Sequence, residues 1–447
     1  MAAPTCEGVL HVEVRLRTTP FVRADDIRDD VAQWLLRKFE CLSVGDCFTA
    51  LENPEHNECI ELIKVDGYSG PERKRVCFTT QEIALDVQLY RLYTNDNEDS
   101  GSASMIDEDD DVLKQLHLMP LPALSLDGLW ESLIYPEHMH SDLLRLAARM
   151  LKMTRNRKVD KNLICWNGLF LLHGPPGSGK TTLCRGLAQK LKIRLGHVYL
   201  NGTLIEIHTE ALFSKFFGES GKIVGQIFDR IEALADLDDE TLLCIMIDEV
   251  ETLVAPRENS AFGGEVADAM RVTNGVLTAL DRLRNRPNVI VLCTSNITDA
   301  IDSAFMDRAD VIQLVPDPGP DAVYGILRSS FNELIKQGIL TSTAVCEPHE
   351  SSSVTNDTDT DNNHDSTLQD PALFPSLGIV ELMAAEDSSA MKLLNISKQC
   401  LGMSGRKLRK LPSKAVGLYT YSDQPSVEEV LEALQKTADK EKSVKTG

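Results

Sequence analysis

Apolar and polar side chains alternate along residues 9–17, and apolar side chains then recur at helical spacing along residues 26–39. A period of two is typical of a half-buried strand, and a period near 3.6 is typical of an amphipathic helix. The apolar positions of this helix are Ile27, Val31, Trp34 and Leu35. We therefore predict that a small α+β domain begins near the N-terminus.

Short apolar runs alternate with amphipathic stretches farther along the chain. The first of these stretches, 141–153, has the period of a helix. The predicted strands are 168–173, 203–207, 242–247, 288–293 and 310–315. Regular alternation of strands and helices is typical of a parallel sheet that is covered by helices on both faces. From about residue 320 to the end the pattern is helical.

Two acidic segments interrupt these patterns. Acids, Ser and Gly crowd residues 94–111, which favours a solvated linker. Residues 341–370 contain seven acids and neither Lys nor Arg, so this segment buries too little apolar area to offset its ordering entropy and is expected to be a disordered insert. The predicted parts are an N-terminal α+β domain (1–93), an acidic linker (94–126), a large α/β domain (127–319) and a helical domain (320–447).

Composition narrows the class of protein. The 447 residues carry a net charge of −22, which argues against a default affinity for the nucleic-acid backbone. The 11 cysteines form no C-x-x-C pair, so reduced thiols fit better than a disulfide or zinc framework. No stretch approaches the roughly 18 apolar residues of a membrane span, and the N-terminus lacks a long apolar core. We expect a soluble, intracellular protein without membrane association.

Residues 174–181 read GPPGSGKT and match the phosphate-binding pattern G-x-x-x-x-G-K-[ST] between a predicted strand and a predicted helix. In this motif glycines let backbone N–H groups wrap a phosphate, Lys180 reaches the β and γ phosphates, and the Thr181 hydroxyl can ligate Mg²⁺. The residues predicted to bind ATP are Gly174, Pro175, Pro176, Gly177, Ser178, Gly179, Lys180, Thr181 and Thr182.

A second stretch, SKFFGESGK at 214–222, resembles the first but fails the same test. Phe216 stands where the first glycine is required, Ile223 replaces the metal-binding hydroxyl, and Glu219 would repel a phosphate. Two aromatic residues followed by Gly218, between predicted helices at 210–217 and 221–235, instead favour a loop that projects apolar rings. Aromatic residues at a helix end are otherwise usually part of a core.

Two acids follow the predicted strand 242–247. Asp248 is predicted to hold Mg²⁺, and Glu249 is predicted to polarise the water that attacks the γ-phosphate. Asn296 follows the next strand and offers an uncharged amide that could hold this water. Without the upstream phosphate loop, the acids and the amide would be read as ordinary turn residues.

Two arginines are candidate partners of the γ-phosphate. Arg308 could stabilise the transferring phosphate from a neighbouring subunit, although a surface ion pair with Asp307 and Asp310 is the simpler interpretation. Arg406 lies at a predicted helix start in the helical domain and could contact the γ-phosphate within the same chain. By itself it would be one residue of a basic helix face.

The ordered motifs LLHGPPGSGKTTLCRGLAQKL, ALFSKFFGESGK, IDEVETL, TSNIT, DRAD and GMSGRKLRKLP resemble the AAA+ ATPase module over about residues 127–440. In detail they resemble the pachytene checkpoint protein family of AAA+ ATPases. DGLWESLIY is similar to the segment with which the ATPase domain of that family begins.

This resemblance implies a homohexamer that hydrolyses ATP with Mg²⁺ and partly unfolds HORMA-domain proteins, converting their closed form to the open one. Phe216, Phe217 and Gly218 would then form the pore loop that grips the substrate, and the N-terminal domain would receive it with a HORMA-type adaptor. The family acts in spindle checkpoint silencing and on the meiotic chromosome axis, which implies a nuclear location, at chromosomes and kinetochores, as well as a cytoplasmic one.

Two other functions compete with this one. A nucleic-acid-associated AAA+ motor or clamp loader would need basic pore loops, whereas the candidate loop is aromatic. A scaffold that senses ATP without hydrolysing it would lack the base or the phosphate-loop lysine, but Glu249 and Lys180 are both present.

Overall fold

The computed structural model divides into two compact units. One comprises Met1–Trp130, Met139–His173 and Lys180–Leu314, and the other Glu131–His138, Gly174–Gly179 and Val315–Gly447. The residues that the structure describes are 8–17, 23–49, 57–71, 77–80, 82–94, 116–136, 139–156, 160, 163, 166–207, 209, 220–254, 264–284, 286–297, 301–341, 373–383, 385 and 387–443. The proposed pore loop and, except for its first residue, the predicted acidic insert lie outside them. Within this described part, no helix has the length and apolar character needed to cross a bilayer.

An α+β domain opens the first unit, as the alternation along residues 9–17 predicted. Its main sheet has the strand order β3-β4-β1-β6, with β1 antiparallel to β4 and parallel to β6. A short pair, β2 and β5, forms a second sheet. The elements are β1 (Gly8–Leu16), α1 (Ala24–Lys38), β2 (Cys41–Ser43), β3 (Cys47–Phe48), β4 (Ile60–Ser69), β5 (Cys77–Thr79) and β6 (Ile83–Tyr90).

The two faces of the β1 strand differ sharply in polarity. Leu10, Val12 and Val14 belong to one apolar cluster with Val31 and Leu35 of α1. Because successive side chains of a strand point to opposite faces, His11 and the other odd-numbered residues of β1 lie on the opposite face.

The ATPase-type sheet of the first unit has the order β12-β8-β11-β10-β9-β7. The first five strands in this order are parallel to their neighbours, which confirms the predicted parallel sheet. β8, which leads to the phosphate loop, lies between β11 and β12, the point of such a sheet at which ligands bind. The strands are β7 (Leu116–Pro120), β8 (Leu169–His173), β9 (Asn201–Ile207), β10 (Thr241–Ile247), β11 (Val289–Ser295) and β12 (Val311–Leu314).

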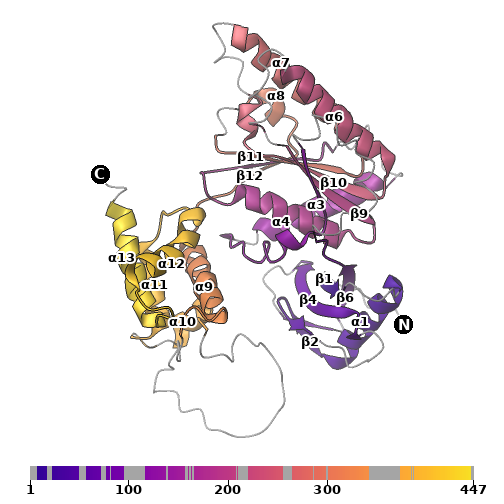
Figure 1. Cartoon of the computed structure of the whole chain (residues 1–447). Coiled ribbons are helices and arrows are strands. Elements are labelled where there is room, and N and C mark those ends of the chain that lie inside the picture. The colour runs from indigo at the N-terminus through magenta and orange to yellow at the C-terminus, as the bar shows by residue number, and fades with distance from the viewer. Residues whose placement is uncertain are drawn as a thin grey trace. The chain divides into compact units, whose positions relative to one another are not determined.

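Helices cover both faces of this sheet (Figure 1). One core joins alternate strand residues, such as Leu171 and Ile245, to Ile227 of α6 and Val276 of α7. α4 contacts β9, β10 and β11 from the other face, and α3 packs on α4. The elements are η3 (Leu124–Leu126), α3 (Met139–Arg155), α4 (Lys180–Arg194), α6 (Ser220–Leu237), η5 (Val250–Thr252), α7 (Gly264–Leu283) and α8 (Ser303–Met306).

The structure corrects the end of the predicted linker. Residues 116–120 are strand β7, which pairs antiparallel with β9 in the ATPase-type sheet. Leu116 is buried in the same core as α6 and α7. The acidic composition of residues 94–111 favours a linker, but it does not extend to the short apolar run 116–120, which forms the edge strand of this sheet.

The second unit contains the predicted helical domain. A single apolar cluster, which includes Phe331, Val380, Leu394, Leu411 and Leu434, joins the five helices of its described part. Ser388 caps α11, its side chain accepting the backbone N–H of Met391. The helices are α9 (Pro320–Lys336), α10 (Leu377–Met383), α11 (Ser389–Gln399), α12 (Gly405–Tyr419) and α13 (Val427–Ser443).

Two adjacent leucines of α1 test the separate core of the N-terminal domain. Leu35 is fully buried, whereas Leu36 is 45% exposed. We expect Leu35→Ala to destabilise this domain by about 2–5 kcal/mol because it leaves a cavity, and Leu36→Ala to change its stability by no more than about 0.5 kcal/mol. Hydrogen exchange of the α1 amides measures both effects. Equal protection of α1 in the two variants would contradict this assignment of the core.

Candidate active site

The phosphate loop belongs to the second unit as far as Gly179, and its glycines are needed for steric reasons. Gly174 has a φ of +147°, and a Cβ atom at this position would lie 2.3 Å from the carbonyl oxygen of Val315. Gly177 has a φ of +82° and lies against Ser404. L side chains rarely adopt such angles, so the sequence pattern and the backbone geometry agree. The Tyr135 hydroxyl, 3.3 Å from two carbonyl oxygens of the loop, restrains it further.

Arg406 lies at the start of α12, as predicted from the sequence, and is next to the same loop. Its backbone N–H donates to the Gly177 carbonyl oxygen at 3.2 Å. This contact places the arginine within the second unit beside the part of the loop that wraps a phosphate in this motif. The predicted role of its guanidinium remains a prediction.

Lys180 and Thr181 begin α4 in the first unit. Thr182 lies in the first turn of this helix. Lys180 Nζ donates to Asn296 Oδ1 at 2.9 Å, and Asn296 uses its backbone N–H to bond Glu251 Oε1 at 3.0 Å. The phosphate-loop lysine and the predicted water-holding amide therefore lie together, although 116 positions separate them in the sequence.

The predicted magnesium ligands also meet. The Thr181 hydroxyl lies 3.1 Å from each carboxylate oxygen of Asp248. A hydroxyl and a carboxylate are oxygen donors of the kind that Mg²⁺ prefers, and protein sites for this ion usually supply only one or two such ligands beside substrate phosphates. These two residues therefore fit the predicted metal.

Thr294 is a functional residue that the sequence analysis did not single out. Its hydroxyl donates to Asp248 Oδ1, and the Thr294 Oγ1 atom itself accepts the backbone N–H of Glu249 at 3.2 Å. Thr294 is 1% exposed, so water does not compete for these bonds. One side chain thus orients both the predicted metal ligand and the predicted base.

Glu249 has an unusual backbone. With φ 53° and ψ 51° it is in the left-handed region, and it is the single non-glycine residue of the described chain with a positive φ. Such conformations cost of order 1 kcal/mol or more and persist where surrounding contacts enforce them. The bond from its N–H to Thr294 is one such contact, and the 3-10 turn η5 that follows is another.

Arg308 forms its ion pair with a different acid from Asp307 and Asp310, the two that its sequence neighbourhood suggests. Its Nε and Nη2 bind the carboxylate of Asp281 on α7 at 2.9 and 2.8 Å, and the Asp310 carboxylate instead accepts the backbone N–H groups of Asn167 and Leu169. Hydrogen bonding within this pair raises the pKa of Arg308 and lowers that of Asp281. Neighbours in sequence had suggested the wrong acids, because α7 lies far from Arg308 in the sequence.

Sequence comparisons identify the family. The profile of the ATPase family associated with various cellular activities (AAA) matches residues 170–317. The TRIP13 N-terminal domain matches residues 6–95, and the TRIP13-like AAA+ ATPase lid C-terminal domain matches residues 319–442. The pachytene checkpoint protein 2 homologue of Gallus gallus is 37% identical over 98% of this chain and 94% of its own length.

The chain belongs to the pachytene checkpoint protein 2 family and is an AAA+ ATPase. The human homologue is 34% identical over 97% of this chain and 93% of its own length. The Arabidopsis thaliana homologue is 43% identical over 72% of this chain and 66% of its own length. An AAA ATPase domain binds nucleotide, which agrees with the phosphate loop.

Solved structures agree with this assignment. C. elegans PCH-2 aligns with a TM-score of 0.72 and 26% identity, covering 97% of this chain and 99% of that one. A chain of the E. coli MS115-1 HORMA:CdnC:Trip13 complex aligns with a TM-score of 0.51 over 72% of this chain and 96% of that one. At 17% identity, the second likeness shows a shared fold.

Thr294 provides a test of the site geometry in this family member. Thr294→Val keeps the shape of the side chain but removes the hydroxyl that orients Asp248 and Glu249. We expect kcat for ATP hydrolysis to fall by about 10–100-fold, as is typical when a residue that orients a metal ligand is lost, with a much smaller change in KM. Steady-state phosphate release at varied ATP concentration measures both constants.

Thr294→Ser is the matched control, because it retains the hydroxyl and should keep most of the activity. A folded Thr294→Val protein with the wild-type kcat would show that this hydroxyl is not needed.

Proposed function

We propose that this ATPase works as a homohexameric ring that remodels HORMA-domain proteins, partly unfolding the closed form to release the open one. The observation that carries the proposal is the pair of contacts at the start of α4, from Lys180 to Asn296 and from Thr181 to Asp248. These contacts support the proposed roles of the four residues in binding phosphate, metal and the attacking water of a P-loop ATPase. Membership of the pachytene checkpoint protein 2 family supports the choice of substrate class.

The chain's own residues divide the work of hydrolysis. Lys180 binds the β and γ phosphates, and Thr181 and Asp248 would hold Mg²⁺, which neutralises phosphate charge when bound. Glu249 accepts the proton of the attacking water, while Asn296 orients that water. The left-handed backbone of Glu249, bonded to Thr294, fixes the direction from which its carboxylate approaches.

Two arginines complete the proposed site. Arg406 contacts the γ-phosphate in its own subunit and Arg308 contacts that of the neighbouring subunit. In the single chain Asp281 holds the Arg308 guanidinium, so the proposed role requires that a γ-phosphate compete with this carboxylate. The pair is half exposed, and exposed ion pairs contribute only about 0–1 kcal/mol, which makes such an exchange feasible.

The HORMA substrate class rests on two supports. The chain has a domain of the TRIP13 N-terminal type and a lid of the TRIP13 type, and a chain with the same fold occurs in a complex with a HORMA protein. By the resemblance described above, a HORMA-type adaptor delivers the substrate, and Phe216, Phe217 and Gly218 grip it in the central pore. The work would concern the spindle checkpoint and the meiotic chromosome axis, in nucleus and cytoplasm.

Glu249→Gln tests the proposed base. The amide has the size of the carboxylate but cannot accept the proton, so we expect ATP turnover to fall by at least about 10²-fold while ATP binding and ring formation persist. Phosphate release and nucleotide titration measure the two effects. Glu240→Gln, at an exposed turn, removes the same charge elsewhere and should retain full turnover. Normal hydrolysis by Glu249→Gln would refute the assigned role.

Phe216→Ala tests the proposed pore loop. Removing the gripping ring should uncouple hydrolysis from remodelling, so that fewer closed HORMA-domain molecules are converted for each ATP hydrolysed. The measurement pairs a conformer assay with phosphate release in the same sample. Leu237→Ala removes a large apolar side chain that is 71% exposed at the end of α6, and it should leave this ratio unchanged. An unchanged ratio in Phe216→Ala would rule out the gripping role.

A further inference from the structure

Charged side chains are buried on the polar face of the N-terminal sheet. His11 and Glu13 of β1 are 8% and 4% exposed, although a carboxylate such as that of Glu13 is rarely buried unless it is paired. Their partners lie on two sides. His11 contacts its neighbours in the same sheet, Ser69 and Asp86, at 2.9 and 3.0 Å. Glu13 instead contacts a residue of the ATPase-type domain.

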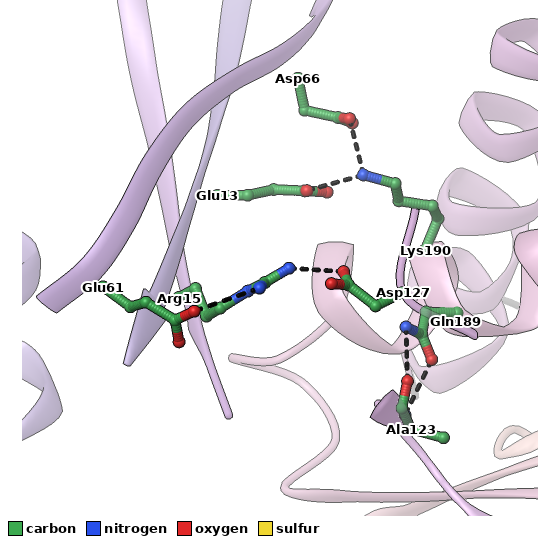
Figure 2. A network of polar contacts seen from close by, with 8 residues as sticks. All are labelled: Glu13, Arg15, Glu61, Asp66, Ala123, Asp127, Gln189 and Lys190. Carbon is green, nitrogen blue, oxygen red and sulfur yellow. Dashed lines mark hydrogen bonds and ion pairs between the residues drawn. The ribbon is translucent and has the colours of Figure 1, made fainter. Parts of the chain in front are cut away.

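Lys190 of α4 is the centre of this second set of contacts (Figure 2). Its Nζ lies 2.7 Å from Glu13 Oε2 and 2.8 Å from Asp66 Oδ1. Arg194 Nη2 lies 2.9 Å from Asp66 Oδ2. All four side chains are at most 8% exposed. We call Glu13, Asp66, Lys190 and Arg194 the charge cluster. It pairs two acids of the N-terminal domain with two bases, four residues apart, on one helix.

The pKa shifts of Glu13 and Asp66 indicate how Lys190 and Arg194 compensate the buried negative charge. Burial acts to raise the pKa of Asp66, but the charges of Lys190 and Arg194 outweigh it and hold this pKa well below its usual range. Burial and the nearby Asp66 charge raise the pKa of Glu13 to about 7, against the effect of Lys190. Loss of Lys190 would therefore leave two neighbouring buried acids with Arg194 and Lys64 as the remaining nearby bases, and a buried charge that loses its partner is strongly unfavourable.

The end of α4 and the residues just after it make further polar contacts close to the N-terminal domain. Gln189 binds both the N–H and the carbonyl oxygen of Ala123, at 2.8 and 3.1 Å (Figure 2). Just beyond the helix, His197 Nδ1 lies 3.1 Å from Gln88 Nε2 and 3.4 Å from Gln88 Oε1 of β6. The helix that begins with the phosphate-binding Lys180 thus ends at the N-terminal domain, and about 15 Å of continuous helix separates Lys180 from Lys190.

The apolar clusters of the N-terminal sheet and of the α6–α7 face each lie within one domain. The cluster that holds α1 on its sheet contains only residues of the N-terminal domain, and the cluster beneath α6 and α7 contains none of them. Each side would keep its own core after separation, and the charged groups that meet at the boundary are readily hydrated. Polar boundaries of this kind permit relative domain motion.

We propose that the charge cluster is a releasable latch that docks the N-terminal domain on the phosphate-loop helix. When it is closed, Lys190 and Arg194 neutralise Glu13 and Asp66, and the domain is fixed on α4. When it opens, water solvates the four charges and the domain moves as an intact body. The latch acts on domain position and does not depend on which protein the ATPase remodels.

Lys190→Met in the full-length protein tests the latch. Breaking a buried pair on one side is costly enough that we expect the ratio of docked to undocked molecules to fall by about 100-fold or more. Dyes on unnatural amino acids at the exposed positions Arg37 and Leu237 report the domain distance by single-molecule energy transfer. Wild-type protein should give one narrow distance, and Lys190→Met a broad distribution. A narrow wild-type distance retained in Lys190→Met would overturn the proposal.

Two further variants separate the latch from a general loss of structure. Lys192→Met removes a buried lysine two residues away from Lys190. Burial lowers the pKa of Lys192 to about 8, and no acid is paired with it among the ion pairs of the described residues. This variant should keep the narrow distance. Glu13→Met combined with Lys190→Met removes one acid with its base, leaves Asp66 with Arg194, and should restore docking at least about tenfold relative to Lys190→Met. If the α1 amides of this double variant stay protected from hydrogen exchange, so that the domain is folded, but docking does not recover, the charge-pair explanation is refuted.

Discussion

The parallel pairing of β8, β11 and β10 is the constraint on which the active site depends. Ile247 pairs with Cys293 and Ser295 with His173, so the three strands end at the same edge of the sheet. Asp248 and Asn296 follow these ends directly, and the loop after β8 returns α4 to them. Residues from three distant parts of the sequence therefore meet within hydrogen-bond distance, and Thr294 holds two of them in one orientation.

The helix α4 links this edge to the rest of the first unit. Its first residues contact Asp248 and Asn296, its middle packs on the sheet, and its last turns contact the N-terminal domain. Apolar packing holds each domain together separately, whereas the connections at the two ends of the helix are hydrogen bonds and ion pairs. Polar contacts of this kind are specific in direction and can be exchanged for water or phosphate at modest cost, which suits the proposed remodelling function.

Sequence patterns predicted the parts of the fold whose cause is local. The phosphate loop, the five parallel strands and the helical domain follow from glycine positions and periodicity, and the acids after β10 follow from their place at a strand end. Contacts between distant residues left no such signal: β7 pairs with β9, Asp281 binds Arg308, and Thr294 bridges Asp248 and Glu249. The charge cluster was also missed, because Glu13 and Lys190 read as ordinary surface residues until the fold brings them together.

We propose that these residues hydrolyse ATP and that the hydrolysis drives the conversion of a closed HORMA-domain protein. The most direct measurement is simultaneous phosphate release and conformer conversion by the purified wild-type protein, with adaptor and with Mg²⁺ either present or chelated. We expect both rates to require Mg²⁺ and to rise and fall together as the ATP concentration is varied. Phosphate release without any conversion, or conversion that continues without ATP, would contradict this proposal.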